Sequence, residues 1–508
     1  MRHPMSPLDA IFLLAEDGVT HMHIGSCSIF VGPSPSIDEI TGLIESKLPL
    51  LTRYRQKVRF VPGSWGHPVW VDDPHFNLSY HVRHSALPPP GDDQDLENLM
   101  GRLMSQELDR HRPLWEAWVI EGLPADRWAL ITKAHHCMVD GVSGTDLMAV
   151  LLDPDRAATT CGIEPWTPEP EPSDLRLTIE AMTRLAFNPA RQLLAWRSAG
   201  IHPRRAWDRL GEVAAGLRSF GTSLIEPVKL VSVEGAIGPH RRWAVGRCTL
   251  GDVKTIRTAF GGSVNDVVLA AISGAFRTLL IERGDQVDDD LVLRSLVPVS
   301  VRHADDHTWN NQVSLILAEL PVGIADPLER LGAVREQMAV LKSSHQVAAG
   351  EAVVASAELV PPVLLALGAR AAMTVLRKMP QRTVNTVTTN VPGPQFPLYA
   401  LGREMLEYLP FVPLSEGVRI GVAILSYNGQ LAFGITGDYD TVPDVDFMAD
   451  QIEAELSGLR ELAEQRGPSA SGVVGANHRR SASQSTLTHK IAANPVLDDR
   501  AQSRTSTS

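Results

Sequence analysis

The feature of this 508-residue sequence that most constrains its fold is the alternation of strand-like and helix-like segments in two long stretches. The first stretch covers about residues 9–152 and the second about residues 243–464. Each combines short apolar runs, which are typical of buried strands, with longer segments whose apolar residues recur at helical spacing. The sequence therefore predicts a mixed α/β chain with two halves of similar texture.

The clearest elements can be placed from these patterns. In the first half we expect a strand over residues 25–31, a buried strand over residues 128–132 and an amphipathic helix over residues 95–108. In the second half, apolar runs predict three strands, at residues 291–299, 312–320 and 419–426.

A proline-rich segment separates the two halves and reads as an exposed connector, because it has little apolar periodicity. Its prolines are Pro154, Pro165, Pro168, Pro170 and Pro172. The last residues of the chain are rich in Ser, Thr, Ala and Asn without periodicity, which predicts disorder. We therefore expect an N-terminal subdomain at 1–172, a basic helical linker at 173–240, a C-terminal subdomain at 241–466 and a disordered tail at 467–508.

The linker has its own pattern. Between residues 175 and 229 basic side chains outnumber acidic ones, and Leu, Phe and Trp recur among them. An amphipathic basic helix of this kind can lie on an anionic lipid surface. It can equally bridge two domains with its basic face in solvent, and the sequence leaves both interpretations open.

Charge, cysteine spacing and hydropathy exclude several classes of protein. The formal net charge of −12 argues against a nucleic-acid binder, since such proteins neutralise phosphates with clustered Lys and Arg. No apolar run has the roughly 20 residues of a membrane-spanning helix, and we expect a cytoplasmic protein without a signal peptide. The cysteines lack the spacing of a zinc ribbon or a disulfide framework and fit a reducing compartment: Cys27, Cys137, Cys161 and Cys248.

The segment that most suggests chemistry is His135-His136-Cys137-Met138-Val139-Asp140-Gly141, between a predicted buried strand and a predicted helix. Because successive strand residues point to opposite faces, His135 and His136 cannot both project into one cavity. A neutral imidazole can take a proton from an alcohol near physiological pH. One histidine is thus a candidate general base and the other a support, with Asp140 orienting the loop.

Two other interpretations of the histidine pair stay open from these residues alone. One is a buried structural histidine beside a surface one. The other is a metal site, because histidines and an aspartate can bind zinc or iron. No second acidic or histidine cluster with familiar ligand spacing stands beside the pair, so we expect no metal.

Further short motifs follow one another along residues 5–464. They are Met5-Ser6-Pro7-Leu8-Asp9-Ala10, Met22-His23-Ile24-Gly25, Pro113-Leu114-Trp115, Ser263-Val264-Asn265-Asp266-Val267, Val297-Pro298-Val299-Ser300-Val301-Arg302, Asn390-Val391-Pro392-Gly393-Pro394 and Leu425-Ser426-Tyr427-Asn428-Gly429. With the histidine motif, this ordered series resembles the bacterial wax ester synthase/diacylglycerol acyltransferase family. That family is itself similar to condensation domains and chloramphenicol acetyltransferase.

The resemblance implies a fold and an activity. The fold would be two chloramphenicol-acetyltransferase-like subdomains, each a mixed β-sheet with flanking helices, around a central tunnel. The activity would be direct transfer of a long-chain acyl group from acyl-CoA onto diacylglycerol, which gives triacylglycerol. A fatty alcohol is the alternative acceptor, giving a wax ester, and a catalytically weak protein bound to lipid inclusions is a second alternative. Acyl-CoA would be a substrate, no cofactor is expected, and peripheral association with the inner membrane or lipid inclusions is a further expectation.

The resemblance also implies roles for the residues of the histidine motif. His136 would be the proton acceptor, while His135 and Asp140 maintain the site. Gly141 would support the turn, and Arg302 is the expected ion-pair partner of Asp140.

Other motif residues have a structural explanation beside the functional one. Asn265 and Asp266 are expected site supports, but Asp266 would also close a capping box with Ser263, so helix initiation explains it equally well. Asn390 is another expected support, within a rigid turn predicted over residues 390–394.

Roles are also expected for three residues before the histidine motif and for the cysteine within it. Pro113, Leu114 and Trp115 cannot exchange a proton, so they are expected to pack or to line the substrate channel. Cys137 resembles a nucleophile, but direct transfer needs no acyl-cysteine, and a small apolar role is expected for it.

Overall fold

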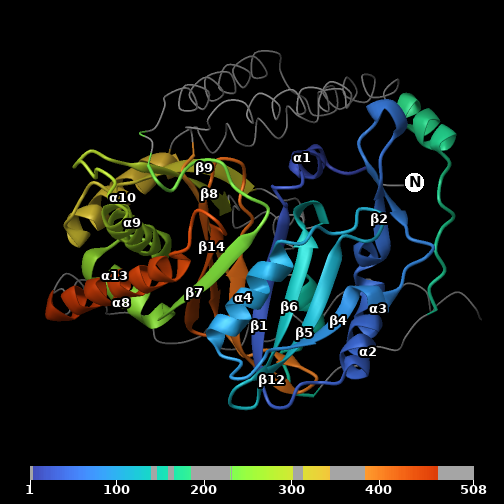
Figure 1. Ribbon diagram of the computed structural model, residues 1–508, viewed down its shortest axis with the longest axis horizontal. Helices are drawn as coiled ribbons and strands as arrows, with labels where there is room; N and C mark the ends of the chain where they lie inside the picture. Colours follow the sequence, from blue (N-terminus) through green and yellow to red (C-terminus); the bar gives the residue numbers. More distant parts are fainter. Residues whose placement is uncertain are drawn as a thin grey trace, which may run out of the picture. The chain divides into compact units, whose positions relative to one another are not determined.

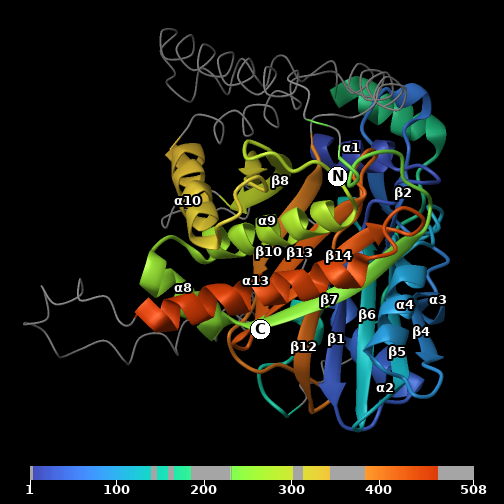
Figure 2. The same cartoon turned by 60° about the vertical axis from the view of Figure 1, so that its left-hand side comes forward.

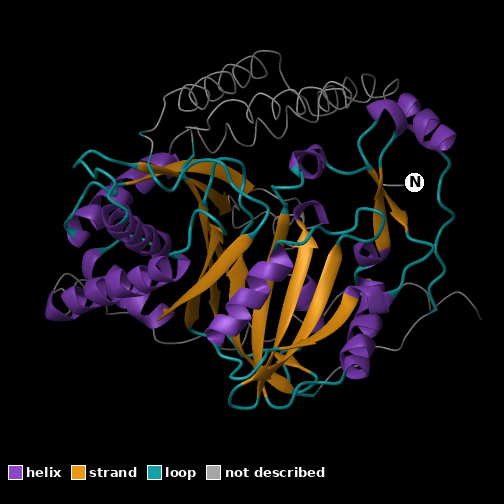
Figure 3. Cartoon of the chain, viewed as in Figure 1, coloured by secondary structure: helices purple, strands orange, loops and turns teal. Residues whose placement is uncertain are grey.

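The computed structural model describes residues 4–138, 146–157, 165–184, 229, 231–300, 313–343 and 384–466. Two six-stranded sheets and the helices packed on them make up most of this part of the chain (Figures 1 and 3). All of these strands belong to one unit of dense internal contacts, which ends at Gln465. The mixed α/β class predicted from the sequence is confirmed.

The first sheet has the strand order β11-β12-β1-β6-β5-β4. Strands β4 and β5 pair in parallel, whereas the other neighbours pair antiparallel, so the sheet is mixed. The strand predicted at residues 25–31 is β1 and begins two residues earlier. In the order of the sheet, the strands are β11 (Tyr399–Ala400), β12 (Arg403–Phe411), β1 (His23–Val31), β6 (Arg127–His135), β5 (Trp115–Leu123) and β4 (Val82–Ala86).

Strand β6 is buried on both faces, which explains its unbroken apolar run. Trp128 and Leu130 belong to one hydrophobic core, and Ala129 and Ile131 belong to another on the opposite face. The first core also receives residues from the helices α1 (Pro7–Ala15), α2 (Ile37–Lys47) and α5 (Asp146–Leu151), and the second from α4 (Asp93–Met104).

Helix α4 ends four residues before the predicted end at residue 108. The buried Lys133 ammonium donates hydrogen bonds to the carbonyls of Leu103 and Gln106 at this point. A cation is favourable there because the last carbonyls of a helix have no partner within it.

The second sheet has the order β7-β14-β13-β10-β8-β9, with β10 parallel to both β13 and β8. Three of its strands match predicted ones: β8, β9 and β13. In the order of the sheet, the bounds are β7 (Arg241–Thr249), β14 (Gln430–Asp438), β13 (Ile420–Tyr427), β10 (Thr386–Pro392), β8 (Leu293–Ser300) and β9 (Val313–Leu320).

The rigid turn predicted at residues 390–394 is wrong in its first part. Asn390, Val391 and Pro392 are the last residues of β10 and pair with β13. The pairing of β10 with β8 covers Thr386 and Val387 alone, so the strand end has one paired side and tolerates a proline. The chain leaves the strand at Gly393, whose amide still donates to the Ser426 carbonyl at 2.9 Å.

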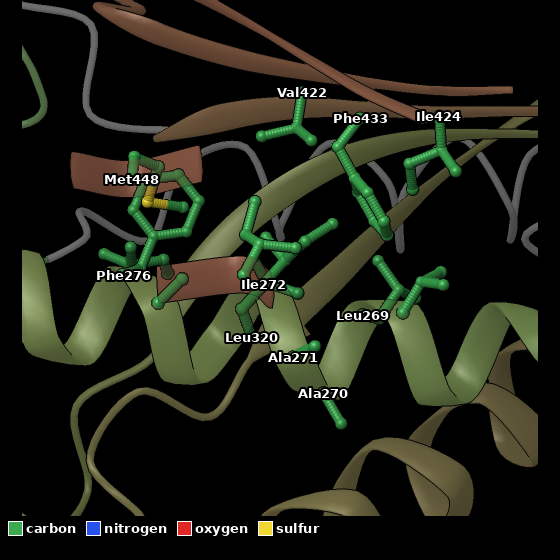
Figure 4. Packing of buried hydrophobic residues seen from close by; sticks show 14 of the residues in the cluster. Leu269, Ala270, Ala271, Ile272, Phe276, Leu320, Val422, Ile424, Phe433 and Met448 are labelled. Carbon is green, nitrogen blue, oxygen red and sulfur yellow. The ribbon is translucent and has the colours of Figure 1, made fainter. Parts of the chain in front are cut away.

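Four helices supply the hydrophobic core that packs on the second sheet (Figure 2): α8 (Leu250–Phe260), α9 (Val264–Glu282), α10 (Pro327–Ser343) and α13 (Val445–Arg466). In Figure 4, Leu269, Ile272 and Phe276 of α9 point toward Phe433 and Met448. By length and composition α9 is apolar enough to cross a membrane, but 72% of its apolar window is buried inside the protein. Its hydropathy is therefore that of a central core helix.

The two sheets are linked because two strands from the second half of the chain belong to the first sheet, an arrangement that we call the strand exchange. Strands β11 and β12 come late in the chain but lie in the first sheet, where β12 pairs with β1. Strand β12 also contacts β13 and β14 of the second sheet. The indole of Trp243 on β7 donates to the carbonyl of Pro410 on β12 at 3.1 Å. The division into subdomains at 172 and 241 stays a prediction, but the chain between 399 and 411 completes the first sheet.

A small hairpin, β2 (Gln56–Arg59) and β3 (Val69–Asp72), carries part of the connector region. Residues 174–184 are helical, and Leu177 packs against Val69 and Val71. The rest of the predicted basic linker, apart from residues 229 and 231–240, lies outside the described residues, as does the tail after residue 466. Short helical turns complete this half: α3 (Leu78–His81), η1 (Leu48–Leu50), η2 (Thr52–Arg55), η3 (Pro62–Ser64) and η4 (His136–Met138).

Candidate active site

The histidine pair lies where β6 ends and a short 3-10 turn begins. His135 is the last residue of β6, and His136 opens η4. The amide of His135 donates to the carbonyl of Leu114 at 2.9 Å, and that of His136 donates to the carbonyl of Met22 at 2.8 Å. The two rings have different neighbours, since the ring of His136 stacks on Phe12 and Nε2 of His135 faces Glu16.

Helix α1 packs against η4, the turn that His136 opens. The His136 ring stacks on Phe12, with ring centroids 4.0 Å apart and an interplanar angle of 22°. Burial lowers the pKa of His136 to about 4, although a contact with its own backbone opposes the shift. The imidazole is therefore neutral at physiological pH and has a lone pair to accept a proton.

His135 is fully buried, with a hydrogen bond at one ring nitrogen and a carboxylate near the other. Its Nδ1 accepts a hydrogen bond from the amide of Cys137 at 3.1 Å. A neutral imidazole that accepts at one nitrogen has its proton on the other, so Nε2 bears the hydrogen. That Nε2 lies 3.4 Å from Oε2 of Glu16. The ring of His135 thus lies between the turn and Glu16, and its role as a support stays a prediction.

Glu16 is the charged residue that sequence reasoning missed. It follows α1 directly, its side chain is 5% exposed, and Nε2 of His23 lies 3.0 Å from its Oε1. Arg110 donates to its Oε2 from Nη2 at 2.6 Å and from Nε at 3.1 Å. Burial alone would raise the pKa of Glu16, but contacts with His135 and His23 outweigh burial and hold that pKa well below its usual range.

The neighbouring histidine of β1 is neutral as well. Burial lowers the pKa of His23 to about 3, against the opposing effect of Glu16. A signal for this arrangement was present in the sequence, because Glu16 and His23 flank a short loop between an amphipathic helix and a strand.

Within the described residues, no group of three or more His, Cys, Asp or Glu side chains is arranged to hold a metal ion.

Three predicted site residues lie outside the described residues: Asp140, Gly141 and Arg302. The ion pair expected between Asp140 and Arg302 therefore stays a prediction.

Three predicted supports from the second half do lie within the described residues, and two of them meet. The side-chain Nδ2 of Asn390 donates to Oδ1 of Asn265 at 3.3 Å, which links β10 to the first turn of α9. Asp266 closes the predicted capping box: its Oδ2 accepts from the amide of Ser263 at 2.7 Å. This confirms helix initiation as one role of Asp266.

The predicted channel residues are packed in the first half. Leu114 and Trp115 are fully buried, and Pro113 is buried beside them. The Trp115 indole donates to the carbonyl of Tyr54 at 2.8 Å and stacks on His81, with ring centroids 4.7 Å apart. Packing is thus one role of these residues, and the lining of a channel stays a prediction.

Cys137 is a buried free thiol. Burial, with smaller contributions from Asp9 and Glu16, raises the pKa of this thiol far above its ordinary value. A thiol that resists ionisation is a poor nucleophile, so the side chain suits the small apolar role expected for it.

Comparison with known families agrees with this geometry. The model described as "Wax ester synthase/diacylglycerol acyltransferase catalytic domain" matches residues 5–268, and the model "WS/DGAT C-terminal domain" matches residues 309–460. A Mycobacterium tuberculosis protein named "Probable diacylglycerol O-acyltransferase" is 38% identical over 92% of this chain and 97% of its own length. A second protein of that species, named "Putative diacylglycerol O-acyltransferase", is 33% identical over 90% of this chain and 99% of its own.

Solved structures extend the comparison to the fold. The wax ester synthase/diacylglycerol acyltransferase from Marinobacter aquaeolei VT8 matches with a TM-score of 0.66 and 26% identity, over 91% of this chain and 99% of that one. The first condensation domain of the calcium-dependent antibiotic synthetase shares the fold, with a TM-score of 0.55 and 16% identity over 92% and 97% of the two chains. The fold is therefore that of two chloramphenicol-acetyltransferase-like subdomains, and the chain belongs to the wax ester synthase/diacylglycerol acyltransferase family.

Proposed function

We propose that this protein is a diacylglycerol O-acyltransferase that moves a long-chain acyl group from acyl-CoA to diacylglycerol. The observation that carries the proposal is the neutral, enclosed imidazole of His136 at the end of β6, in a chain of this family. The mycobacterial relatives named for this activity align over nearly their whole length. The chemistry requires no cofactor, because acyl-CoA is a substrate.

In the proposed reaction His136 takes the proton from the acceptor hydroxyl as its oxygen attacks the thioester carbonyl. The tetrahedral intermediate collapses, the C–S bond breaks, and protonated His136 returns its proton to the CoA thiolate. Nε2 is the accepting atom in this proposal, because Nδ1 is buried. General-base assistance supplies about 10²- to 10⁴-fold, so positioning of both substrates in the expected tunnel supplies much of the rest.

The alternative acceptor is a long-chain alcohol, which would give a wax ester. The Marinobacter structure, named for both activities, supports this second candidate. The proton chemistry is the same for both acceptors, and apolar pockets separate similar chains by about 1 to 3 kcal/mol per methylene. Some wax ester formation beside triacylglycerol is consistent with the proposal.

The test supplies purified protein with labelled palmitoyl-CoA and either dioleoylglycerol or hexadecanol, followed by chromatography of the lipids. We expect triacylglycerol from the wild-type protein and a loss of nearly all product from His136→Ala. His84→Ala, which changes a half-exposed histidine on β4, is the matched control and should keep wild-type turnover. Full turnover by folded His136→Ala would contradict the mechanism, and lipid binding without product would favour the inclusion-binding alternative.

We further propose a cytoplasmic protein that associates peripherally with a membrane or lipid inclusion. Leu175, Ile179 and Met182 support this, since they share one face of the helix at residues 174–184 and are 70%, 55% and 46% exposed. Trp65, on a neighbouring loop, is 44% exposed. Apolar side chains with an aromatic residue nearby are typical of helices that lie in a lipid interface. Arg204 and Arg205, also expected to favour anionic lipid, lie outside the described residues.

Vesicle sedimentation tests this association. The double variant Leu175→Asp/Ile179→Asp should bind less to vesicles of phosphatidylcholine, phosphatidylglycerol and dioleoylglycerol. Leu50→Asp alters a leucine that is 66% exposed elsewhere on the first half and should sediment like the wild type. Equal sedimentation of all three proteins would exclude a role for this helix face.

A further inference from the structure

Glu16 stands out among the buried titratable groups because direct acyl transfer gives it no task. Its carboxylate contacts three side chains from separate parts of the first half: His23 on β1, His135 on β6 and Arg110 before β5. Isolating an ionised carboxylate from water is costly unless partners compensate. Arg110 supplies the compensating charge and is itself 39% exposed at the outer side of the group.

A continuous series of contacts leads from this carboxylate to the proposed base. Oε2 of Glu16 faces Nε2 of His135, and Nδ1 of the same ring accepts the amide hydrogen of Cys137. Cys137 follows His136 in the turn η4. A carboxylate at Nε2 favours the tautomer with hydrogen on Nε2, and this tautomer leaves Nδ1 free to accept from the turn.

Helix α1, which ends directly before Glu16, also contacts the base itself. Phe12 stacks on the His136 ring, and the amide of Glu16 donates to the carbonyl of Phe12 at the end of α1. Arg110 donates to the carbonyl of Leu13 at 3.3 Å as well as to the Glu16 carboxylate. Arg110 therefore holds the end of α1 and the carboxylate in one geometry.

We propose that Glu16, held by Arg110, is a positioning residue for His136: it fixes the tautomer and orientation of His135, which in turn fixes the turn that carries the base. This inference rests on the proposed function, since it assigns a role within that reaction. It adds a carboxylate outside the histidine motif to the machinery. Because Glu16 acts through another residue, its loss should reduce kcat without weakening the binding of acyl-CoA.

The main test compares Glu16→Gln with the wild type in acyl transfer to dioleoylglycerol. We expect kcat to fall about 10- to 100-fold, the size of effect known for carboxylates that orient metal-binding histidines, while KM for acyl-CoA changes less than about twofold. Glu107→Gln is the matched control: this carboxylate is 60% exposed and lies 4.0 Å from Nδ1 of His21, whose ring stacks on that of His23. Wild-type kcat in Glu16→Gln would overturn the proposal.

The variant Arg110→Met provides a second test of the proposal if Glu16→Gln folds poorly. It removes the charge that holds the carboxylate and should lower kcat in the same direction. Arg112→Met is its control, because Arg112 is equally exposed, at 40%, and pairs with Asp109 instead. Wild-type kcat in folded Arg110→Met would count against the role assigned to that residue.

A double-mutant cycle separates positioning from general stabilisation. If Glu16 acts through His135, the change Glu16→Gln should cost little further kcat in a His135→Gln background. Fully additive losses would overturn the route through His135. A merely structural glutamate would lower the melting temperature while leaving kcat per folded molecule unchanged, which would also overturn the proposal. His136→Ala is measured in parallel: full activity in that variant contradicts the proposed function, whereas an inactive His136→Ala with a normal Glu16→Gln contradicts only the role of Glu16.

Discussion

At the scale of single residues, the lowered pKa of His136, whose ring stacks on Phe12, predicts the pH dependence of the reaction. Burial lowers its pKa from 6.5 to about 4, so the base should stay neutral and competent well below pH 6.5. We expect kcat/KM for acyl-CoA to be level from about pH 8 to about pH 5 and to fall roughly tenfold per unit below about pH 4. Protonation removes the lone pair, which is why the loss comes on the acid side.

The profile is measured with stopped assays after brief exposure to each pH, and a return to pH 7.5 restores the activity of molecules that stayed folded. A midpoint near 6.5 would show instead that the imidazole is solvated during the reaction and that its enclosure by Phe12 is lost.

Residue patterns alone could place the histidine pair but not the groups that surround it. His135 ends a predictable strand, and His136 opens the turn that follows it. Phe12 and Glu16 reach them only because α1 folds back over η4, and no local pattern encodes a contact between segments so far apart in the chain. The sequence therefore pointed to Asp140 as the carboxylate of the site and left Glu16 unnoticed.

At the scale of elements, the start of α9 predicts what Asp266 does. Its carboxylate, at N3 of the helix, accepts from the amide of the N-cap residue Ser263, and loss of one such hydrogen bond costs about 1 kcal/mol. We expect Asp266→Ala to lower the free energy of unfolding by about this amount in urea titrations, with an unchanged m value. Glu282→Ala, at the exposed far end of the same helix, should be neutral or slightly stabilising, because a carboxylate there opposes the helix dipole. Wild-type stability with lost acyl transfer would instead make Asp266 a residue of the site.

Strands could be predicted where an unbroken apolar run was the dominant pattern. Apolar runs located β1, β6, β8, β9 and β13, because burial on the faces of a sheet demands such runs. The turn predicted at residues 390–394 was wrong where pairing with β13 overrides the turn preference of Asn and Pro. Tertiary pairing of this kind is invisible to local propensity.

At the scale of the whole molecule, the exchange of β12 into the first sheet was the feature that the sequence did not predict. No local sequence pattern near residue 405 indicates that this strand pairs with β1 and not with strands that are close to it in the chain. This arrangement requires a glycine at one position of β14. At Gly434 on β14, an added Cβ would lie 1.8 Å from the Pro410 carbonyl oxygen of β12. Only a residue without a side chain permits this approach of the two sheets.

Gly434→Ala should therefore force the sheets apart and destabilise the molecule by about 1 to 3 kcal/mol, since the added methyl group meets a backbone atom of a neighbouring strand. Urea unfolding measures the loss, together with the soluble fraction on expression. Gly458→Ala is the control within the same half: nothing lies within 4 Å of its added methyl group on α13, and alanine in a helix is favoured by about 0.5 to 1 kcal/mol. Both substitutions add one methyl group. Changes of opposite sign in the free energy of unfolding would therefore show that the cost comes from the contact between β14 and β12. A Gly434→Ala protein that unfolds at the wild-type midpoint would mean that the sheets can separate there freely, and the strand exchange would then not depend on this approach.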